Sequence, residues 1–204
     1  MGSNRTYHYD NREGAWIRKG AAMGKALGMV EYVTVSTGIQ AADIILKTAN
    51  VEIIEAQTVC PGKYIVLFSG ELSAVKASME AAKEKFSMHL IDSFVLGNPH
   101  ASIFPAIYGS TPMEDVKALG VLETFSGAAM IVAADEAAKT SQIELIELRI
   151  ARGMCGKSYL MLTGEVAAVE AAIEKAKKAA GERGMLLDSS IIANPDGQLW
   201  DSIL

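Results

Sequence analysis

The two cysteines of this 204-residue chain are its most distinctive candidates for chemistry, and each stands in a turn-like segment. Cys60 precedes a Pro-Gly pair in "TVCPGK", and Cys155 stands in "RGMCGK". A free cysteine is most often buried as a small hydrophobic residue. Pro61 and Gly62 indicate a rigid, exposed connection instead, so a functional thiol at Cys60 is the alternative interpretation. Aligning Gly62 with Gly156 sets Cys155 opposite Pro61, so the two cysteines are not equivalent.

Residues 151–158, "ARGMCGKS", fit a relaxed phosphate-loop pattern in which Ala151 replaces the first glycine. A phosphate loop needs a strand before it and a helix directly after it, so that backbone amides and the helix dipole hold the phosphate. The "YLMLTGE" that follows predicts a strand instead, and the equivalent "CPGKYIVLF" of residues 60–68 lacks the serine or threonine. A nucleotide-dependent enzyme using Lys157 is therefore a minor alternative.

No other set of side chains forms a catalytic or metal-binding pattern. The three histidines share no spacing with each other or with the cysteines that suggests a zinc site; they are His8, His89 and His100. Two acidic positions recur in predicted strands, which favours a structural role over paired acid–base chemistry; they are Glu31, Glu123, Asp92 and Asp188. We therefore predict that the chain is not an enzyme.

Composition argues against several classes of protein. Half of the residues are hydrophobic, but no apolar run reaches the roughly 18 residues that a bilayer requires, so we expect no membrane partner. The first residues lack the apolar segment of a secretory signal, and two cysteines at unrelated positions form no disulfide framework, which points to a reducing cytosol. The net charge of -5 includes no basic stripe, which argues against nucleic acid as a partner.

The chain contains an internal repeat at an offset of 92 residues. Residues 26–54 and 118–146 are identical at 12 of 29 positions, and the match continues after small length changes in two later blocks. Repeats this long are domains rather than solenoid units. We predict a flexible N-terminal extension at 1–22, a first domain at 23–107, a linker at 108–117 and a second domain at 118–204.

Each copy predicts the same elements in the same order. In the first copy, strand character covers residues 26–33, 50–57, 63–69 and 89–98, and helical spacing covers residues 37–48 and 71–86. The first helix should present one apolar face, with the pair Asp43 and Lys47 on the other face; that apolar face comprises Ile39, Ala42, Leu46 and Ala49. The order β-α-β-β-α-β predicts an α+β fold of two tandem ferredoxin-like domains.

The repeated blocks resemble the shell proteins of bacterial microcompartments. The resemblance is carried by "ALGMVE" (26–31), "AADIILKTANVEII" (41–54), "GKYIVLFSGELSAVKASMEAAK" (62–83) and "GNPH" (97–100), each with its second-copy partner. It covers residues 23–204, and "KTANVEIIEAQTVCPGKY" is most similar to the propanediol-utilisation type of tandem member. The resemblance implies a structural protein in the shell of a cytoplasmic microcompartment. It also implies a homotrimer that imitates a hexameric tile and packs edge to edge with other shell proteins.

In that family, the turn between the second and third strands of each domain faces a central pore. The resemblance thereby implies a set of pore-lining residues, namely Thr58, Val59, Pro61, Gly62, Met154 and Gly156. In the propanediol type, a cysteine matching Cys60 holds one [4Fe-4S] cluster per trimer on the threefold axis, for electron transfer across the shell or to lumenal redox enzymes. A cubane cluster normally takes four thiolates, and three copies of Cys60 would supply three of them. Cys155 is a candidate for an extra metal or pore ligand.

The resemblance also assigns contacts at the edge of the tile. Lys47 and Lys139 match the family's edge lysine, and Asn98 and Asn194 stand where the family often has an arginine. Two further interpretations stay open. In one, Cys60 lines a metabolite-conducting pore that holds no cluster; in the other, the duplicated fold is a small-molecule regulatory module, because ferredoxin-like domains host many functions.

Overall fold

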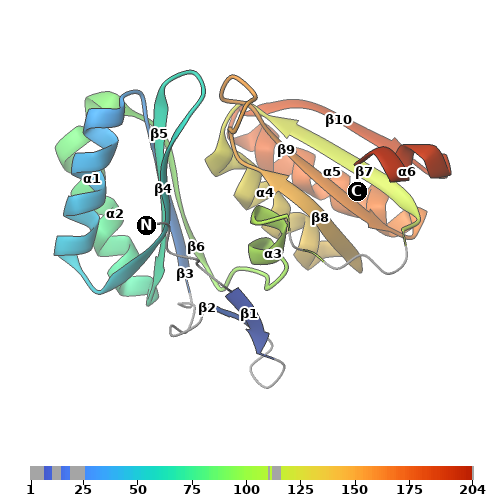
Figure 1. Ribbon diagram of the computed structural model, residues 1–204, viewed down its shortest axis with the longest axis horizontal. Coiled ribbons are helices and arrows are strands. Elements are labelled where there is room, and N and C mark those ends of the chain that lie inside the picture. Colours follow the sequence, from blue (N-terminus) through green and yellow to red (C-terminus); the bar gives the residue numbers. More distant parts are fainter. Residues whose placement is uncertain (1–6, 11–14, 19–25, 110, 112–115, 204) are drawn as a thin grey trace. The chain divides into compact units, whose positions relative to one another are not determined.

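The computed structural model describes residues 7–10, 15–18, 26–109, 111 and 116–203. The chain forms two compact units, Met1–Phe104 and Pro105–Leu204. Within the predicted extension, β1 (Tyr7–Asp10) pairs antiparallel with β2 (Ala15–Arg18) (Figure 1). The rest of that extension, and most of the predicted linker at residues 110 and 112–115, lie outside the described residues.

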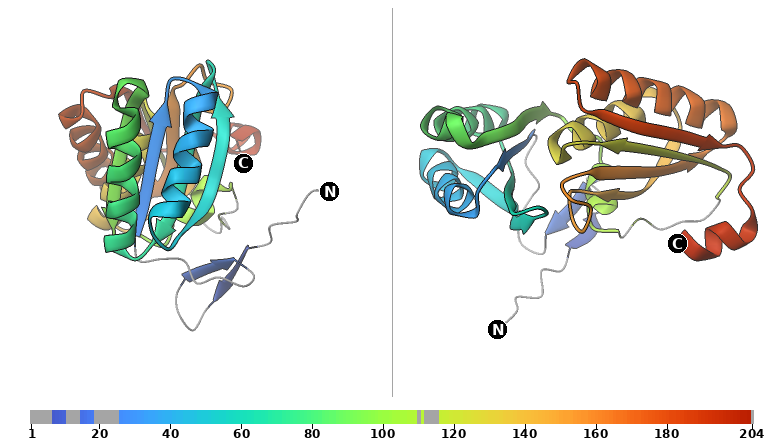
Figure 2. Two further views of the ribbon diagram at one scale, coloured as in Figure 1. Left: turned by 90° about the vertical axis from the view of Figure 1, so that its left-hand side faces the viewer. Right: turned by 90° about the horizontal axis from the view of Figure 1, so that it is seen from above.

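The first unit is a four-stranded antiparallel sheet with two long helices on one face (Figure 2). Its elements are β3 (Ala26–Tyr32), α1 (Val35–Thr48), β4 (Val51–Val59), β5 (Lys63–Gly70), α2 (Leu72–Phe86), the 3-10 turn Ser87–His89, β6 (Leu90–Gly97) and α3 (Ile103–Ile107). The strands lie in the order β4-β5-β3-β6. This is the ferredoxin-like order, in which the first and third strands of the motif lie at the centre.

The second unit repeats this arrangement (Figure 1). Its elements are β7 (Ala118–Thr124), α4 (Gly127–Thr140), β8 (Ile143–Arg149), β9 (Ser158–Gly164), α5 (Val166–Glu182), β10 (Leu186–Ile192) and α6 (Gly197–Ile203). The strand order is β10-β7-β9-β8, so each strand has the neighbours of its counterpart in the first unit. The predicted fold class, two tandem α+β domains, is confirmed.

The core between the sheet and the helices combines apolar packing with a few buried hydrogen bonds. In the first unit, Tyr32 packs edge-on against Phe86 with ring centroids 6.1 Å apart, and its hydroxyl donates to Ala82 O at 3.0 Å. Burial raises the pKa of Tyr32 to about 12. Ser78 of α2 donates to Ile45 O of α1 at 2.9 Å, which joins the two helices. Both of these buried hydroxyls therefore have the partner that burial requires.

Two equivalent glycines mark where a helix packs directly on the central strand. A Cβ at Gly120 would lie 2.8 Å from Leu162 and 2.9 Å from both Val169 and Ile173 of α5. A Cβ at Gly28 in the first unit would lie 2.7 Å from the ring of Phe68. A side chain at either position would push the helix away from the sheet.

Gly120→Ala is expected to lower the free energy of unfolding by about 1–3 kcal/mol, because a methyl group in this packed layer forces shifts in the core. Gly181→Ala is the matched control, since a Cβ at this α5 position meets no atom within 4 Å. Alanine there should stabilise the helix by up to about 1 kcal/mol. Urea unfolding measures both effects, and a Gly120→Ala protein as stable as the parent would contradict the packing described.

The helix α1 buries a different face from the one predicted. Its buried residues are Thr37, Gly38, Ala41 and Ile45. Ile39 and Leu46, predicted to form the apolar face, are 55 % and 50 % exposed. The small Gly38 lets the helix approach β5, where a Cβ would lie 2.4 Å from Tyr64. The predicted pair of Asp43 and Lys47 is present at 2.7 Å, with side chains 58 % and 75 % exposed, but it does not lie on a face opposite a buried Ile39 and Leu46.

Candidate metal-binding turn and its counterpart in the second unit

The turn that carries Cys60 is short and tightly closed. β4 ends at Val59 and β5 begins at Lys63, and these two residues pair across the strands. The amide of Gly62 donates to Val59 O at 3.0 Å, and Gly62 has a φ of 97°, which glycine adopts without strain. The Cys60–Pro61 peptide bond is cis. The Cys60 thiol is exposed at the tip of this turn, as the Pro-Gly pair predicts.

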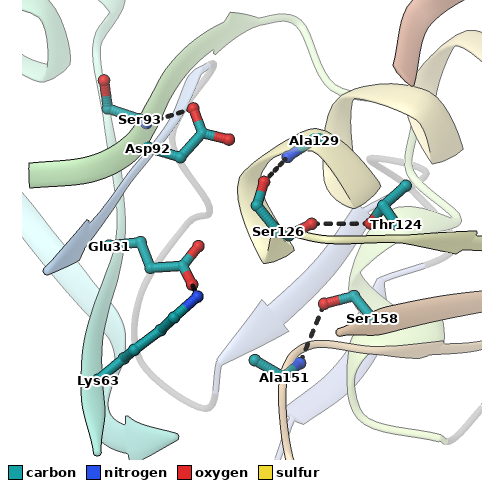
Figure 3. A network of polar contacts seen from close by, with 9 residues as sticks. All are labelled: Glu31, Lys63, Asp92, Ser93, Thr124, Ser126, Ala129, Ala151 and Ser158. Atoms are coloured by element: carbon teal, nitrogen blue, oxygen red, sulfur yellow. Dashed lines mark hydrogen bonds and ion pairs between the residues drawn. The ribbon is translucent and has the colours of Figure 1, made fainter. Parts of the chain in front are cut away.

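A buried ion pair supports the base of the Cys60 turn. Lys63, the first residue of β5, lies 2.9 Å from a carboxylate oxygen of Glu31 on β3 (Figure 3). The Glu31 side chain is fully buried, and that of Lys63 is 19 % exposed. In the second unit, the equivalent Glu123 is half-buried and Lys157 is exposed, and no ion pair joins them in the described structure. The pair is therefore particular to the cysteine-bearing turn of the first unit.

The counterpart turn in the second unit is longer. It runs from β8, which ends at Arg149, to β9, which begins at Ser158. The amide of Ala151 donates to the Ser158 hydroxyl at 3.0 Å (Figure 3), and the amide of Lys157 donates to Met154 O at 3.1 Å. Ala151 and Cys155 both have positive φ, 54° and 51°. The Cys155 thiol is exposed.

Strand register shows which residues of the two turns correspond. Val51 pairs with Gly70 as Ile143 pairs with Gly164, so the offset between copies is 92 before the turn and 94 after it. Counted from the strand before the turn, Arg152 corresponds to Cys60; counted from the strand after it, Met154 corresponds to Cys60 and Cys155 to Pro61. Sequence analysis gave Arg152 no role of its own, although the change of offset across the turn was visible in the aligned blocks. The other predicted turn residues differ in exposure: Thr58 is exposed, whereas Val59 and Gly156 are buried in their units.

A polar network lies at the base of the second turn, on the face of the sheet opposite the long helices. Arg149 on β8 donates from Nε and Nη2 to one oxygen of Glu147, at 3.0 and 2.7 Å. Tyr159 on β9 donates to the other oxygen of Glu147, and the Arg149 guanidinium lies 5.4 Å from the Tyr159 ring centroid. Burial, and then the hydrogen bond and charge of Glu147, raise the pKa of Tyr159 to about 12. The network fixes the Arg149 and Tyr159 side chains together.

Tyr32 and Tyr159 are expected to ionise near pH 12. Their pKa values are raised above the unfolded value of about 10, so folding favours the neutral phenols. The associated stability is complete below pH 10 and is lost as the pH rises towards 12. Ultraviolet titration of tyrosinate should therefore show two late protons. Tyr159→Phe should remove one of them; an unchanged late phase in that variant would contradict the assignment.

The four predicted edge residues are all at least partly exposed, and they do not gather into one site within either unit. Lys47 pairs with Asp43 at 2.7 Å on an open surface. The equivalent Lys139 pairs at 2.6 Å with Asp135, which is only 1 % exposed. Asn98 and Asn194 are exposed at the ends of β6 and β10. Their assignment to tile contacts stays a prediction.

Within the described ranges, no group of three or more His, Cys, Asp or Glu residues could hold a metal ion. The turn at residues 150–157 leads into strand β9 and not into a helix. The turn therefore lacks the geometry of a phosphate loop. His89 ends the 3-10 turn instead of beginning β6, and the His100 ring lies 2.8 Å from the Ser102 hydroxyl. The chain therefore offers two exposed thiols in turns, and a metal held by Cys60 would need ligands from more than one copy.

Comparison with known proteins supports the duplicated architecture. The pattern of the BMC domain matches residues 26–99 and 118–195. The chain belongs to the BMC domain family. This tandem BMC protein is 38 % identical over 178 residues to the bacterial microcompartment shell protein PduT of Citrobacter freundii, covering 87 % of this chain and 97 % of that one. It is a structural shell protein, and the prediction that it is not an enzyme is confirmed by this family.

Other relatives of the tandem BMC protein are also microcompartment or carboxysome shell proteins. A microcompartments protein from Desulfitobacterium hafniense has a crystal structure that matches with a TM-score of 0.79 and 46 % identity, over 86 % of this chain and 98 % of that chain. The carboxysome shell protein CsoS1 of Prochlorococcus marinus is 36 % identical over 88 residues, 42 % of this chain and 85 % of its own. The predicted location in a microcompartment shell is confirmed. No helix in the described part of the chain is long and apolar enough to cross a membrane.

Proposed function

We propose that this shell protein is a trimeric, pseudo-hexameric tile whose central pore holds one [4Fe-4S] cluster through Cys60. The observation that supports this proposal is the exposed Cys60 thiol at the tip of the β4–β5 turn. A cysteine that served only as a small hydrophobic residue would be buried in the core. A thiol at the tip of a turn is free to meet its copies on a symmetry axis.

The ligand set fits this cluster in part. Iron–sulfur clusters are held by cysteine thiolates, commonly four. Three copies of Cys60 on a threefold axis supply three, and the described residues of one chain gather no alternative ligand set. The fourth iron would take a small exogenous ligand or another side chain, for which Cys155 is the candidate. When bound, the cluster supplies one-electron redox chemistry.

The chain's own residues hold the ligand turn in place. Gly62 closes the turn onto Val59, and the buried Lys63–Glu31 pair fixes the start of β5 directly beneath it. A rigid turn limits the positions open to the thiol, which lowers the entropy lost when three thiols converge. In the trimer, the remaining residues of the two turns would line the pore, and Arg152 would add positive charge at the second-unit position.

The tile would join other shell proteins edge to edge, with Lys47, Lys139, Asn98 and Asn194 at its rim. Lumenal redox enzymes would then be the partners that exchange electrons with the cluster. A second candidate function keeps the tile and removes the cluster, so that Cys60 lines a metabolite-conducting pore. It is favoured by the second unit, where Arg152 or Met154 instead of cysteine corresponds to Cys60.

Iron and acid-labile sulfide per chain separate these functions. Protein purified without oxygen should contain about four iron and four sulfide for every three chains. Absence of iron after anaerobic reconstitution with iron and sulfide would favour the pore without a cluster. A chain that binds a small effector in solution and never assembles into sheets, as seen by electron microscopy, would favour the regulatory module instead.

A further inference from the structure

A cavity of about 340 Å³ lies between the two long helices of the second unit. These helices, α4 and α5, pack side by side over one face of their sheet (Figure 1). The cavity is lined by two apolar residues and by five charged ones, which are Glu136, Lys175, Lys178, Glu182 and Arg183. Cavities that bind small molecules have volumes of about 300–1,000 Å³, so this one has room for one small ligand.

The charged lining of the cavity carries one net positive charge, because three cations face two carboxylates. The ion pairs among them are long. Lys175 lies 3.3 Å from Glu136 across the two helices. Lys178 lies 4.0 Å from Glu182 along α5. Each ammonium group has three N–H donors, so these pairs leave donors for a ligand. A ligand with a single negative charge would therefore balance the charge of the cavity.

We propose that this cavity binds a small aliphatic monocarboxylate. The carboxylate would lie among Lys175, Lys178 and Arg183, because ammonium and guanidinium groups form short, charge-assisted hydrogen bonds with such an anion. The hydrocarbon part would lie against the half-buried apolar lining, Val132 and Ala179. The aliphatic stems of the two lysines extend this apolar wall. The inference goes beyond the proposed function, because the cavity lies within one unit and requires neither a trimer nor a cluster.

The internal repeat shows that the fold of each unit does not require these lysines. At the offset of 94 that holds after the β8–β9 turn, Lys175 and Lys178 correspond to Ala81 and Glu84 on α2. The first unit therefore packs the same pair of helices with an alanine and a glutamate at these positions. The two lysine side chains are also 46 % and 73 % exposed, so replacing them leaves the core unchanged.

Substitutions that copy the first unit test the site, with butyrate as the probe. Lys178→Glu should weaken butyrate binding about tenfold or more, because a charge-assisted contact becomes a repulsive one. Lys175→Ala should weaken it severalfold. Lys177→Ala is the matched control, since Lys177 lies on the same helix, pairs with Glu174 at 2.7 Å and does not line the cavity. This variant should bind butyrate as the parent protein does.

Saturation-transfer NMR on the whole protein measures the Kd of butyrate, which should be about 1 mM for a ligand of so few atoms. Circular dichroism of each variant checks that it is folded. If the parent protein shows no saturable binding well above this concentration, the cations only stabilise the end of α5 and the inference is wrong. Equal binding by Lys178→Glu and Lys177→Ala would also contradict it, because the ligand would then lie elsewhere.

Three related probes test the class of ligand. Butyramide has the shape of butyrate without its charge and should bind far more weakly. Equal binding of the two would mean that the cavity makes only an apolar contact, and the inference would be wrong. Succinate and inorganic phosphate carry more negative charge than the cavity balances, so tighter binding of either would overturn the assignment to a monocarboxylate. None of these results depends on the iron content of the protein, so failure here leaves the proposed function standing.

Discussion

Cys60→Ser is expected to remove all iron from the trimer, whereas Cys155→Ser should leave about four iron atoms for every three chains. A serine hydroxyl is a much poorer ligand for iron in a cluster than a thiolate, and three equivalent ligands would be lost at once in a symmetric trimer. The two thiols are both exposed, so accessibility alone would not separate the variants. Their separation follows from register, because Cys155 falls opposite Pro61 and not opposite Cys60.

The comparison of the two variants also reports on the fourth ligand. Loss of iron in both variants would bring Cys155 into the site, and retention in Cys60→Ser would exclude Cys60 as a ligand. Sedimentation of each variant provides the control, because a serine at an exposed turn should leave the trimer unchanged. A cluster lost together with the trimer would show only that assembly had failed.

Lys63→Met is expected to lower the free energy of unfolding by about 3–5 kcal/mol. The carboxylate of Glu31 is fully buried, and its lysine partner is 2.9 Å away. Removing Lys63 withdraws a charge that offsets the desolvation of the buried carboxylate, which costs far more than a surface pair contributes. The effect should be large even though Lys63 adjoins an exposed turn.

The internal repeat supplies the matched control for this prediction. Lys157 is the counterpart of Lys63 and is exposed, so Lys157→Met should change the free energy of unfolding by less than about 0.5 kcal/mol. Replacing Glu31 and Lys63 together by methionine should recover most of the lost stability, because no buried charge then remains. Urea unfolding measures all three proteins. Equal effects of Lys63→Met and Lys157→Met would contradict the difference between the two turns.

The fold could be predicted from the sequence because the hydrophobic spacing of each segment agrees with the strand or helix that the segment forms. Residues 26–32 and 63–69 form strands as predicted, and the predicted second helix buries Val75, Met79 and Ala82. Repetition of these blocks in the same order also predicted that both units would share one topology. The exposure of Cys60 followed from the Pro-Gly pair beside it.

The buried face of α1 could not be read from hydrophobic spacing. Ile39 and Leu46 are more apolar than Gly38 and Ala41, yet the small residues face the sheet because the helix lies so close to Tyr64 there. Arg152 received no role for a different reason, since its turn is longer than the Cys60 turn and the aligned blocks on either side do not pair the turn residues one by one.

The most direct test of the central claim is native mass spectrometry of the protein purified without oxygen. The proposed function predicts a species of three chains that carries the added mass of one [4Fe-4S] cluster, and this added mass should disappear in Cys60→Ser. Three chains with no added mass, both as purified and after reconstitution, would contradict the cluster and leave a shell tile with a thiol-lined pore.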